Sequence, residues 1–560
     1  MDAFDTKLMR YQRPKLIRTA TSSDFGGGLD LVTEDVGLKS RFAKVLKNFY
    51  RGLDGSLRLR YGTKQFANFA AVATGTIVDH IYFADYLVVV TTTGQIVKIS
   101  SAGTCTLIWS SAIAALLPGA PSGWGSVTEV SFVQFKGDLV VVNGTDKPIK
   151  ISPTLVVTYL GDPANSNSNV NTPICKYVIA AKEYVVMAGQ SGSETVVFIS
   201  ARQSAGTWSG DTPPNDATTI DVGASVTEGE SRVIGLGRKG DNIFVFFDQG
   251  TVILTLGNYL DDGTHNVQIL DTAEKYGIIS NRLATTIGED TLFTDLVGTG
   301  SFAKNQLGTF YVPDRQSDLI APLLQEVLKK AKLSDMLTSC FAVWHKLLNQ
   351  YIMFVKYEED SVTVTRVFGL ILNKRAEIKF WSEYTGWDFT CGCVSVLGRV
   401  FFGEGTKIYQ LGDTTDEYYA DYFETDPSDE EDGNPIAFDW ELPWSVFSDF
   451  GNMKKFMFIR LFTKGLAQFT VDIFMDYLYK DKDDEYVPTN RMEFVAGDSA
   501  GFGDGDQPYG GGRRTADVRA WSLKESTKFY VAKFRIWGST RKELSISSIT
   551  FGYLLGGAKR

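Results

Sequence analysis

Residues 85–99 read Asp-Tyr-Leu-Val-Val-Val-Thr-Thr-Thr-Gly-Gln-Ile-Val-Lys-Ile, which is a polar residue, an apolar strand, a turn and a second apolar strand. The first part of this pattern, a polar residue followed by a run of β-branched or aromatic residues, returns along the chain. Its seven copies have their anchors at Tyr86, Leu139, Tyr184, Ile243, Leu292, Tyr351 and Val400. The steps between these anchors are 53, 45, 59, 49, 59 and 49 residues.

A period near 50 residues with hairpin content indicates the blades of a β-propeller, because a single blade is too small to bury its own faces. The 54 glycines against 16 prolines suit many tight turns between short strands. The uneven steps leave open a large all-β protein whose hairpins recur at loose intervals. We predict an all-β chain with a degenerate, propeller-like domain over residues 29–412.

The length and composition predict a globular protein of two or more domains. The chain has 560 residues, of which 44% are hydrophobic and 13% aromatic. Its opening, Met-Asp-Ala-Phe-Asp, does not match a signal peptide, and no apolar run approaches the roughly 20 residues of a membrane helix. We therefore expect a soluble protein without a membrane segment that is not exported by the ordinary route.

One stretch, residues 317–337, departs from the strand pattern. Its apolar residues recur at helical spacing and form one stripe, with lysines toward the C-terminal end. We predict an amphipathic helix inserted between blades, which either packs on the β body or contacts another subunit. The stripe consists of Leu319, Leu323, Leu324, Val327, Leu328 and Ala331.

Residues 413–434 carry ten carboxylates and no basic residue. Such a run is usually a solvated linker or loop, and we interpret it as one. Calcium binding is the alternative, but residues 426–433 do not follow the alternating ligand pattern of an EF-hand. The densest part of the run, which either lines a channel or lies in solvent, consists of Asp426, Asp429, Glu430, Glu431 and Asp432.

The segment 435–560 has longer strands in which apolar and polar residues alternate. This pattern is typical of antiparallel strands with one buried face, so we predict a C-terminal β-sandwich domain. The alternating segments are 436–440, 456–462, 469–474, 529–537 and 544–551.

Residues 1–28 form a basic N-terminal arm that ends in three glycines at 26–28. The arm is either a disordered terminus or a docking tail for an acidic partner. Its cations are Lys7, Arg10, Arg13, Lys15 and Arg18.

Motifs for catalysis or cofactor binding are scarce in this sequence. It contains no P-loop, no dinucleotide-binding glycine fingerprint and no Gly-x-Ser-x-Gly elbow. The chain has three histidines and five scattered cysteines, and the Cys391-Gly-Cys393 pair is spaced too tightly for a common zinc knuckle. We interpret the cysteines as reduced and mostly buried, and expect no catalytic residue, no cofactor and no metal.

The order of the parts resembles the tail nozzle proteins of short-tailed bacteriophages, also called tail-hub or stabilisation proteins. The basic arm is followed by Leu-Arg-Leu-Arg-Tyr-Gly-Thr at 57–63, by degenerate hairpin units, and by a late sandwich. One unit contains Tyr-Gly-Ile-Ile-Ser-Asn-Arg-Leu at 276–283. The sandwich opens with Trp-Glu-Leu-Pro-Trp at 440–444 and Lys-Lys-Phe at 454–456.

The resemblance implies a structural virion protein and not an enzyme. Such a protein forms a homohexameric tube beneath the portal and adaptor rings, closes the tail before infection and conducts the genome on ejection. It also holds fibres or spikes, and it is assembled in the host cytoplasm. The basic arm, Lys7 to Arg18, is then the candidate contact with the adaptor.

The charge of the chain fits this expectation. The net charge is −10 and the pI is near 5.1, which argues against a protein that grips nucleic acid and suits a lumen through which DNA slides. The alternative function is a carbohydrate-binding or depolymerising propeller that acts as a receptor-binding tail component. An exposed cluster of Trp or Tyr with carboxylates in one pocket would favour that alternative.

Overall fold

The chain divides into two compact units, Tyr61–Pro435 and Met1–Arg60 with Ile436–Arg560. The first unit therefore interrupts the second in sequence. The structure is a computed structural model, and it describes residues 18–34, 39, 41–116, 123–161, 172–208, 217–226, 232–257, 267–287, 290–302, 313–373, 378–414, 418–422, 433–445, 447, 452–465, 467–475, 488, 490–495, 514–519 and 528–555.

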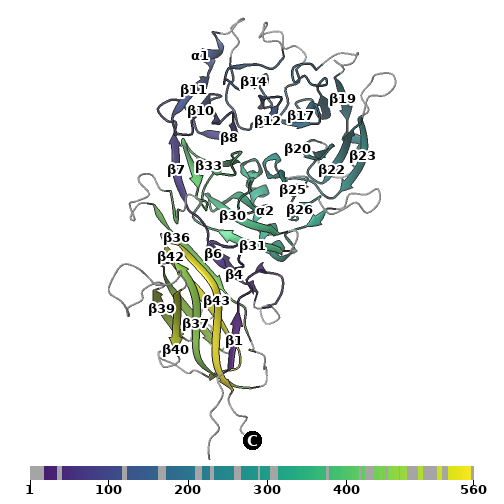
Figure 1. Ribbon diagram of the computed structural model, residues 1–560. Coiled ribbons are helices and arrows are strands. Elements are labelled where there is room, and N and C mark those ends of the chain that lie inside the picture. Colours follow the sequence, from purple (N-terminus) through teal and green to yellow (C-terminus); the bar gives the residue numbers. More distant parts are fainter. Residues whose placement is uncertain are drawn as a thin grey trace, which may run out of the picture. The chain divides into compact units, whose positions relative to one another are not determined.

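The first unit is a β-propeller, as the repeated hairpins predict. In the described residues its strands form seven antiparallel groups of four, which we number as blades 1 to 7 and which surround a centre in Figure 1. Blade 1 has β8 (Ile77–Phe83), β9 (Tyr86–Thr91), β10 (Ile96–Ile99) and β11 (Cys105–Trp109); blade 2 has β12 (Ser131–Phe135), β13 (Asp138–Val142), β14 (Ile149–Ile151) and β15 (Val157–Tyr159); blade 3 has β16 (Tyr177–Ala181), β17 (Tyr184–Gln190), β18 (Ser193–Ile199) and β19 (Thr218–Asp221).

The remaining blades follow in chain order, except for one strand of the last. Blade 4 has β20 (Gly235–Lys239), β21 (Asn242–Phe246), β22 (Gly250–Leu256) and β23 (Val267–Glu274); blade 5 has β24 (Thr285–Ile287), β25 (Asp290–Thr294), β26 (Thr299–Ser301) and β27 (Asp314–Arg315); blade 6 has β28 (Phe341–His345), β29 (Gln350–Glu359), β30 (Val362–Asn373) and β31 (Ile378–Tyr384); blade 7 has β32 (Cys391–Val394), β33 (Val400–Glu404), β34 (Lys407–Leu411) and β7 (Thr63–Asn68).

The seven sequence anchors lie in the second strand of each blade, which is buried on both faces. In β9, Val88 and Val90 pack in one core with β13 of blade 2. The alternate residues, Leu87 and Val89, pack in a different core with Phe401 of blade 7. An uninterrupted apolar run is therefore the pattern that this position requires, because successive side chains face different neighbouring blades.

The ring is closed by a strand from the start of the propeller segment. β7 completes blade 7 by pairing antiparallel with β34, with Thr63 opposite Leu411 and Asn68 opposite Lys407. The first strands of neighbouring blades also contact one another, including β32 of blade 7 and β8 of blade 1. Closure therefore joins segments that lie more than 300 residues apart in sequence.

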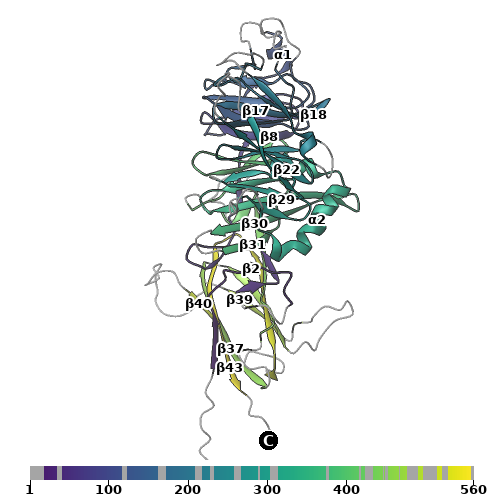
Figure 2. The same ribbon diagram turned by 90° about the vertical axis from the view of Figure 1, so that its right-hand side faces the viewer.

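The predicted amphipathic helix is confirmed. A short 3-10 turn, η3 (Asp318–Ile320), leads into α2 (Ala321–Leu333), and η4 (Leu337–Ser339) follows. The helix buries Leu324, Val327, Leu328 and Ala331 and packs against β29, beside which it lies in Figure 2. The other helical segments described are α1 (Ser111–Ala114), η1 (Gly223–Ser225) and η2 (Asn281–Leu283). Among the described residues, none of the helices has the length and apolar character of a membrane span.

The second unit is the predicted antiparallel β-sandwich. The stacked rings of Phe534 and Phe551, whose centroids are 4.3 Å apart, join its two sheets. One sheet contains β40 (Arg514–Arg519), β37 (Lys454–Gly465), β43 (Leu544–Leu555), β6 (Leu57–Leu59) and β5 (Phe49–Arg51), with β1 (Arg18–Ser22) beside β43 and β41 (Lys528–Phe529) beside β37; the other contains β4 (Val45–Lys47), β36 (Asn434–Glu441), β42 (Ala532–Thr540), β38 (Gln468–Met475) and β39 (Asn490–Val495). A short parallel pair, β2 (Gly28–Leu29) and β3 (Phe42–Ala43), lies between β1 and β4 in sequence.

Two of the predicted domain boundaries differ from this division. Residues 29–60, assigned to the propeller-like domain from sequence, belong to the sandwich unit because β6 pairs with β43 and β4 pairs with β36. The start of the acidic run, assigned to a linker, belongs to the propeller unit. There, β35 (Ala420–Asp421) is buried, and the backbone N–H of Gly62 donates to the carbonyl of Tyr418.

Candidate functional site

The cations of the basic arm are only partly placed. Lys7, Arg10, Arg13 and Lys15 lie outside the described residues. Arg18 is the first residue of β1, where it is exposed and pairs in register with Tyr553 of β43. Its role as a docking residue stays a prediction.

The five acidic candidates, Asp426, Asp429, Glu430, Glu431 and Asp432, also lie outside the described residues. Two earlier carboxylates of the same run, Asp413 and Asp421, are buried with exposed fractions of 2% and 3%. The indole N–H of Trp387 donates to Asp421 at 2.7 Å. The interpretation of the whole run as solvated is therefore wrong for these two residues, because the chain folds back there against blade 7.

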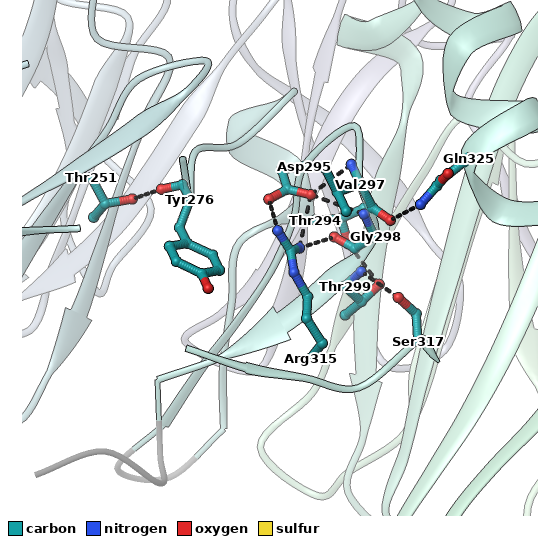
Figure 3. A network of polar contacts seen from close by, with 10 residues as sticks. All are labelled: Thr251, Tyr276, Thr294, Asp295, Val297, Gly298, Thr299, Arg315, Ser317 and Gln325. Carbon is teal, nitrogen blue, oxygen red and sulfur yellow. Dashed lines mark hydrogen bonds and ion pairs between the residues drawn. The ribbon is translucent and has the colours of Figure 1, made fainter. Parts of the chain in front are cut away.

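A polar network in blade 5 fixes the turn between β25 and β26 (Figure 3). Asp295, whose side chain is 5% exposed, accepts backbone hydrogen bonds from Val297 and Gly298 at 2.8 and 2.9 Å. Arg315 pairs with the same carboxylate at 2.6 Å and lies over the ring of Tyr276, with 5.1 Å from Cζ to the centroid. All of these groups are satisfied, so the network serves to hold the turn.

The same turn also anchors helix α2. The Gln325 side chain donates to the carbonyl of Val297 at 3.1 Å, and the backbone N–H of Thr299 donates to the Ser317 hydroxyl at 2.9 Å (Figure 3). The helix is therefore fixed to its blade by polar contacts as well as by its apolar stripe.

A second polar cluster lies between blades 1 and 7, and it joins residues that are 311 positions apart in sequence. Asp79 and His80 of β8 and Cys391 of β32 place one carboxylate oxygen, one ring nitrogen and one sulfur within 4.8 Å of one another. His80 Nδ1 is 3.3 Å from Cys391 Sγ, and His80 Nε2 is 3.2 Å from the carbonyl oxygen of Phe401. His80 and Cys391 are buried, whereas the Asp79 side chain retains an exposed fraction of 15%.

The hydrogen bonds define the tautomer of His80. A carbonyl oxygen only accepts, so Nε2 carries the hydrogen and Nδ1 presents a lone pair to Cys391. Burial lowers the pKa of His80 to about 3, so the ring is neutral at physiological pH. Burial raises the pKa of the Cys391 thiol, which is therefore protonated and donates to Nδ1.

Arg282 of η2 links this cluster to other blades. Its Nε is 3.4 Å from an Asp79 carboxylate oxygen, and its NH2 group donates to the carbonyl of Thr390 at 2.9 Å. The guanidinium also lies over the ring of Phe341, with 5.3 Å from Cζ to the centroid. Burial raises the pKa of Asp79, and the adjacent guanidinium opposes this shift. The side chain of Arg282, in the turn that precedes blade 5, thus contacts blades 1 and 6 and the segment before blade 7.

The sandwich unit contains a cavity of about 350 Å³. It exists because β1 presents only the small side chains of Ala20 and Ser22 on its less exposed side, where the register places Phe551 and Ile549 opposite them. The lining residues are Thr19, Ala20, Thr21, Ser22, Leu442, Pro443, Trp444, Ser445, Phe447, Phe534, Phe551 and Tyr553.

Sequence reasoning missed the cluster of Asp79, His80 and Cys391. The expectation of buried cysteines is confirmed for Cys175, Cys340 and Cys391, while Cys105 and Cys393 are half-buried, and all five are free. The scarcity of histidines lowered the expectation of a His-based site, but it gave no sign that His80 meets a thiol. The one local signal was the Asp-His pair on a strand that otherwise reads as apolar.

Comparisons with known proteins identify no family for this chain, but they find solved structures that are distantly similar to it. No protein-family model matches the sequence, and no curated protein matches it. The structure of U3-55K is similar at 8% identity over 60% of this chain and 96% of that chain, with a TM-score of 0.34. BamB from Moraxella catarrhalis is similar at 10% identity over 61% of this chain and 84% of that chain, with a TM-score of 0.33. Likenesses at this level carry no inference about function.

Proposed function

We propose that this chain is the tail nozzle, or hub, protein of a short-tailed bacteriophage. As a homohexameric tube below the portal and adaptor, it closes the DNA channel before infection and conducts the genome on ejection. It also provides attachment sites for fibres or spikes. The protein acts as a scaffold in this proposal and not as an enzyme.

The observation that supports the proposal is the order of parts along the chain. The N-terminal strands β1, β4, β5 and β6 belong to a sandwich whose other strands begin at residue 434 or later, and the seven blades of the propeller come between the two sets in sequence. A basic arm, the segment at 57–63, degenerate hairpin units and a late sandwich are the features in which the sequence resembles nozzle proteins. Propellers by themselves have many functions, so the combination matters and not the propeller alone.

The charge of the chain gives independent support. A net charge of −10 disfavours adhesion of the DNA backbone to the protein, because phosphates are retained by lysine and arginine. Subunits that contact one another head to tail form a closed ring when the rotation between them closes. The arm from Lys7 to Arg18 then serves as the contact with the adaptor.

No specific observation favours the carbohydrate-binding alternative. Every tryptophan that the structure describes is buried or half-buried, and Tyr530 is the aromatic residue among its exposed large hydrophobic side chains. A sugar platform needs aromatic faces accessible from solvent. The alternative is therefore kept as an outcome of the experiment.

The test is negative-stain imaging of the full-length chain, alone and mixed with portal and adaptor components. We expect sixfold tubes with a central channel, and the chain at the distal end of assembled tails. A stable monomer that never joins tails, or one that binds or degrades a polysaccharide, would refute the proposal.

Charge reversal tests the role of the arm separately. The variant carries Lys7→Glu, Arg10→Glu, Arg13→Glu and Lys15→Glu, and we expect it to bind the adaptor at least tenfold more weakly. The matched control reverses Lys329 and Lys332, which are exposed on α2. Equal binding by both variants would show that the arm is not the contact.

A further inference from the structure

We propose that Asp79, His80 and Cys391 form a binding site for a zinc ion. The three side chains offer oxygen, nitrogen and sulfur within 4.8 Å of one another. Zinc accepts this combination of donors in tetrahedral geometry. The site would join blade 1 to blade 7, where the propeller ring closes.

The separation of the nitrogen and sulfur atoms fits a shared ion. Bonds of about 2.0 Å to nitrogen and about 2.3 Å to sulfur, at a tetrahedral angle, place the two atoms about 3.5 Å apart. The observed distance between His80 Nδ1 and Cys391 Sγ is 3.3 Å. The two side chains therefore accept an ion with a shift of a few tenths of an ångström.

The surroundings of His80 are those of a metal ligand. Its Nε2–H donates to the carbonyl of Phe401 at 3.2 Å, which directs the Nδ1 lone pair toward the sulfur. In protein metal sites the second ring nitrogen almost always makes such a bond, which fixes both tautomer and orientation.

The space around the sulfur is also provided by the fold. Gly403 lies opposite Cys391 in the register of β32 and β33. A Cβ at position 403 would lie 2.6 Å from Cys391 Sγ, so any larger residue would displace the sulfur. The glycine thus keeps the thiol in place beside His80.

When the ion binds, one proton leaves the cluster, and one net positive charge remains, that of Arg282. The Cys391 thiol releases its proton to solvent, and the resulting thiolate and the Asp79 carboxylate together neutralise the two positive charges of Zn²⁺. Arg282, 3.4 Å from an Asp79 oxygen, remains paired with the carboxylate from outside the coordination shell. The Asp79 side chain is 15% exposed, so in this proposal the ion and the released proton exchange with solvent beside Asp79, and water takes the fourth position.

The experiment uses cobalt as a visible substitute for zinc. The full-length chain is freed of metal with a chelator and titrated with Co²⁺. We expect one cobalt per chain, a sulfur-to-cobalt charge-transfer band, and loss of that band when Zn²⁺ is added. Zinc should also raise the melting temperature of the chain.

Two variants and one control locate the site. Cys391→Ser should abolish the charge-transfer band and weaken zinc binding at least a hundredfold, and Asp79→Asn should weaken it at least tenfold. Cys105→Ser changes a half-buried thiol elsewhere and should leave the titration unchanged. The isosteric Asp79→Asn variant keeps the test decisive if the serine variant does not fold.

The proposal fails if no stoichiometric binding occurs in the wild-type chain. It fails equally if cobalt binds without a sulfur band, or if the band survives Cys391→Ser. Either of the last two outcomes would assign the ion to another part of the chain.

Discussion

The second strands of the propeller blades and the strands of the sandwich bury their side chains in different ways. In β21, every residue from Ile243 to Phe246 is fully buried, because the blade packs between two neighbours. In β36, burial alternates, with Ile436, Phe438 and Trp440 inside and Ala437 exposed. When both faces of a strand are packed, a polar residue is tolerated at none of its positions. When only one face is packed, polar residues are tolerated at every second position, where the side chain points to solvent.

Truncation of side chains in β21 tests this difference in burial and should give the largest losses of stability. Phe244 stacks on Phe302 with centroids 4.5 Å apart, and Val245 faces the opposite core. We expect Phe244→Ala to lower the free energy of unfolding by about 4 kcal/mol and Val245→Ala by about 2 kcal/mol. In β36, we expect Phe438→Ala to lower the free energy of unfolding by about 4 kcal/mol. Ala437→Ser, at the neighbouring exposed position, should leave the free energy of unfolding nearly unchanged. Urea unfolding monitored by tryptophan fluorescence measures these changes, and a neutral Val245→Ala would contradict two-sided burial.

The ion pair of Arg282 and Asp79, whose side chains are 14% and 15% exposed, should contribute more to stability than a pair that lies mostly in solvent. Arg282→Leu leaves Asp79 without its charged partner, so we expect a loss of about 3 kcal/mol from the free energy of unfolding. The matched control is Arg202→Ala, which breaks the half-exposed pair with Glu183 and should change the free energy of unfolding far less than Arg282→Leu does. Equal effects in thermal unfolding would show that Arg282 does not connect the blades.

A buried histidine should make the propeller sensitive to acid. Burial lowers the pKa of His345 from 6.5 to about 4, and neither ring nitrogen has a hydrogen-bond partner among the described residues. Between pH 6.5 and pH 4 the His345 side chain is therefore protonated in the unfolded chain but neutral in the folded chain. Stability from this residue is present above pH 6.5 and is lost as the pH falls toward 4, by roughly 3 kcal/mol at most.

The variant His345→Leu removes this titrating group. Melting temperatures measured between pH 7 and pH 4.5 should fall less steeply for the variant than for the wild-type chain. Parallel pH profiles would mean that other groups dominate the acid response.

The smallest effect is expected on the outward face of the sandwich. Asp439 and Arg535 form a two-point ion pair across β36 and β42, at 2.6 and 2.8 Å, with side chains 14% and 40% exposed. We expect Asp439→Asn to cost about 1 kcal/mol, and less at high salt, because partly exposed pairs are screened. Unfolding at low and high ionic strength distinguishes this from a packing effect, which salt would not reduce.

The features that could be predicted from the sequence are those encoded within one short segment. Pairings and contacts between segments far apart in the chain could not be predicted. The apolar runs after Asp85, Asp241 and Gln350 identify the blades, because each hairpin carries its own pattern. Residues 63–68 form only a short strand by themselves, and nothing in them indicates the pairing with residues 407–411. The same holds for the site, because an Asp-His pair and a cysteine 311 residues later become one cluster only through ring closure.

The two long-range strand pairings, β6 with β43 and β7 with β34, also become possible at different times during synthesis of the chain. Leu57 of β6 pairs with Ile546 of β43, and Thr63 of β7 pairs with Leu411 of β34. At roughly 5–20 residues per second, the ribosome takes roughly 20–70 s to pass from the start of β7 to the end of β34, and roughly 25–100 s from β6 to its partner. During synthesis the partner of β7 is therefore made before the partner of β6, and the early sandwich strands have the longest delay before their partners exist.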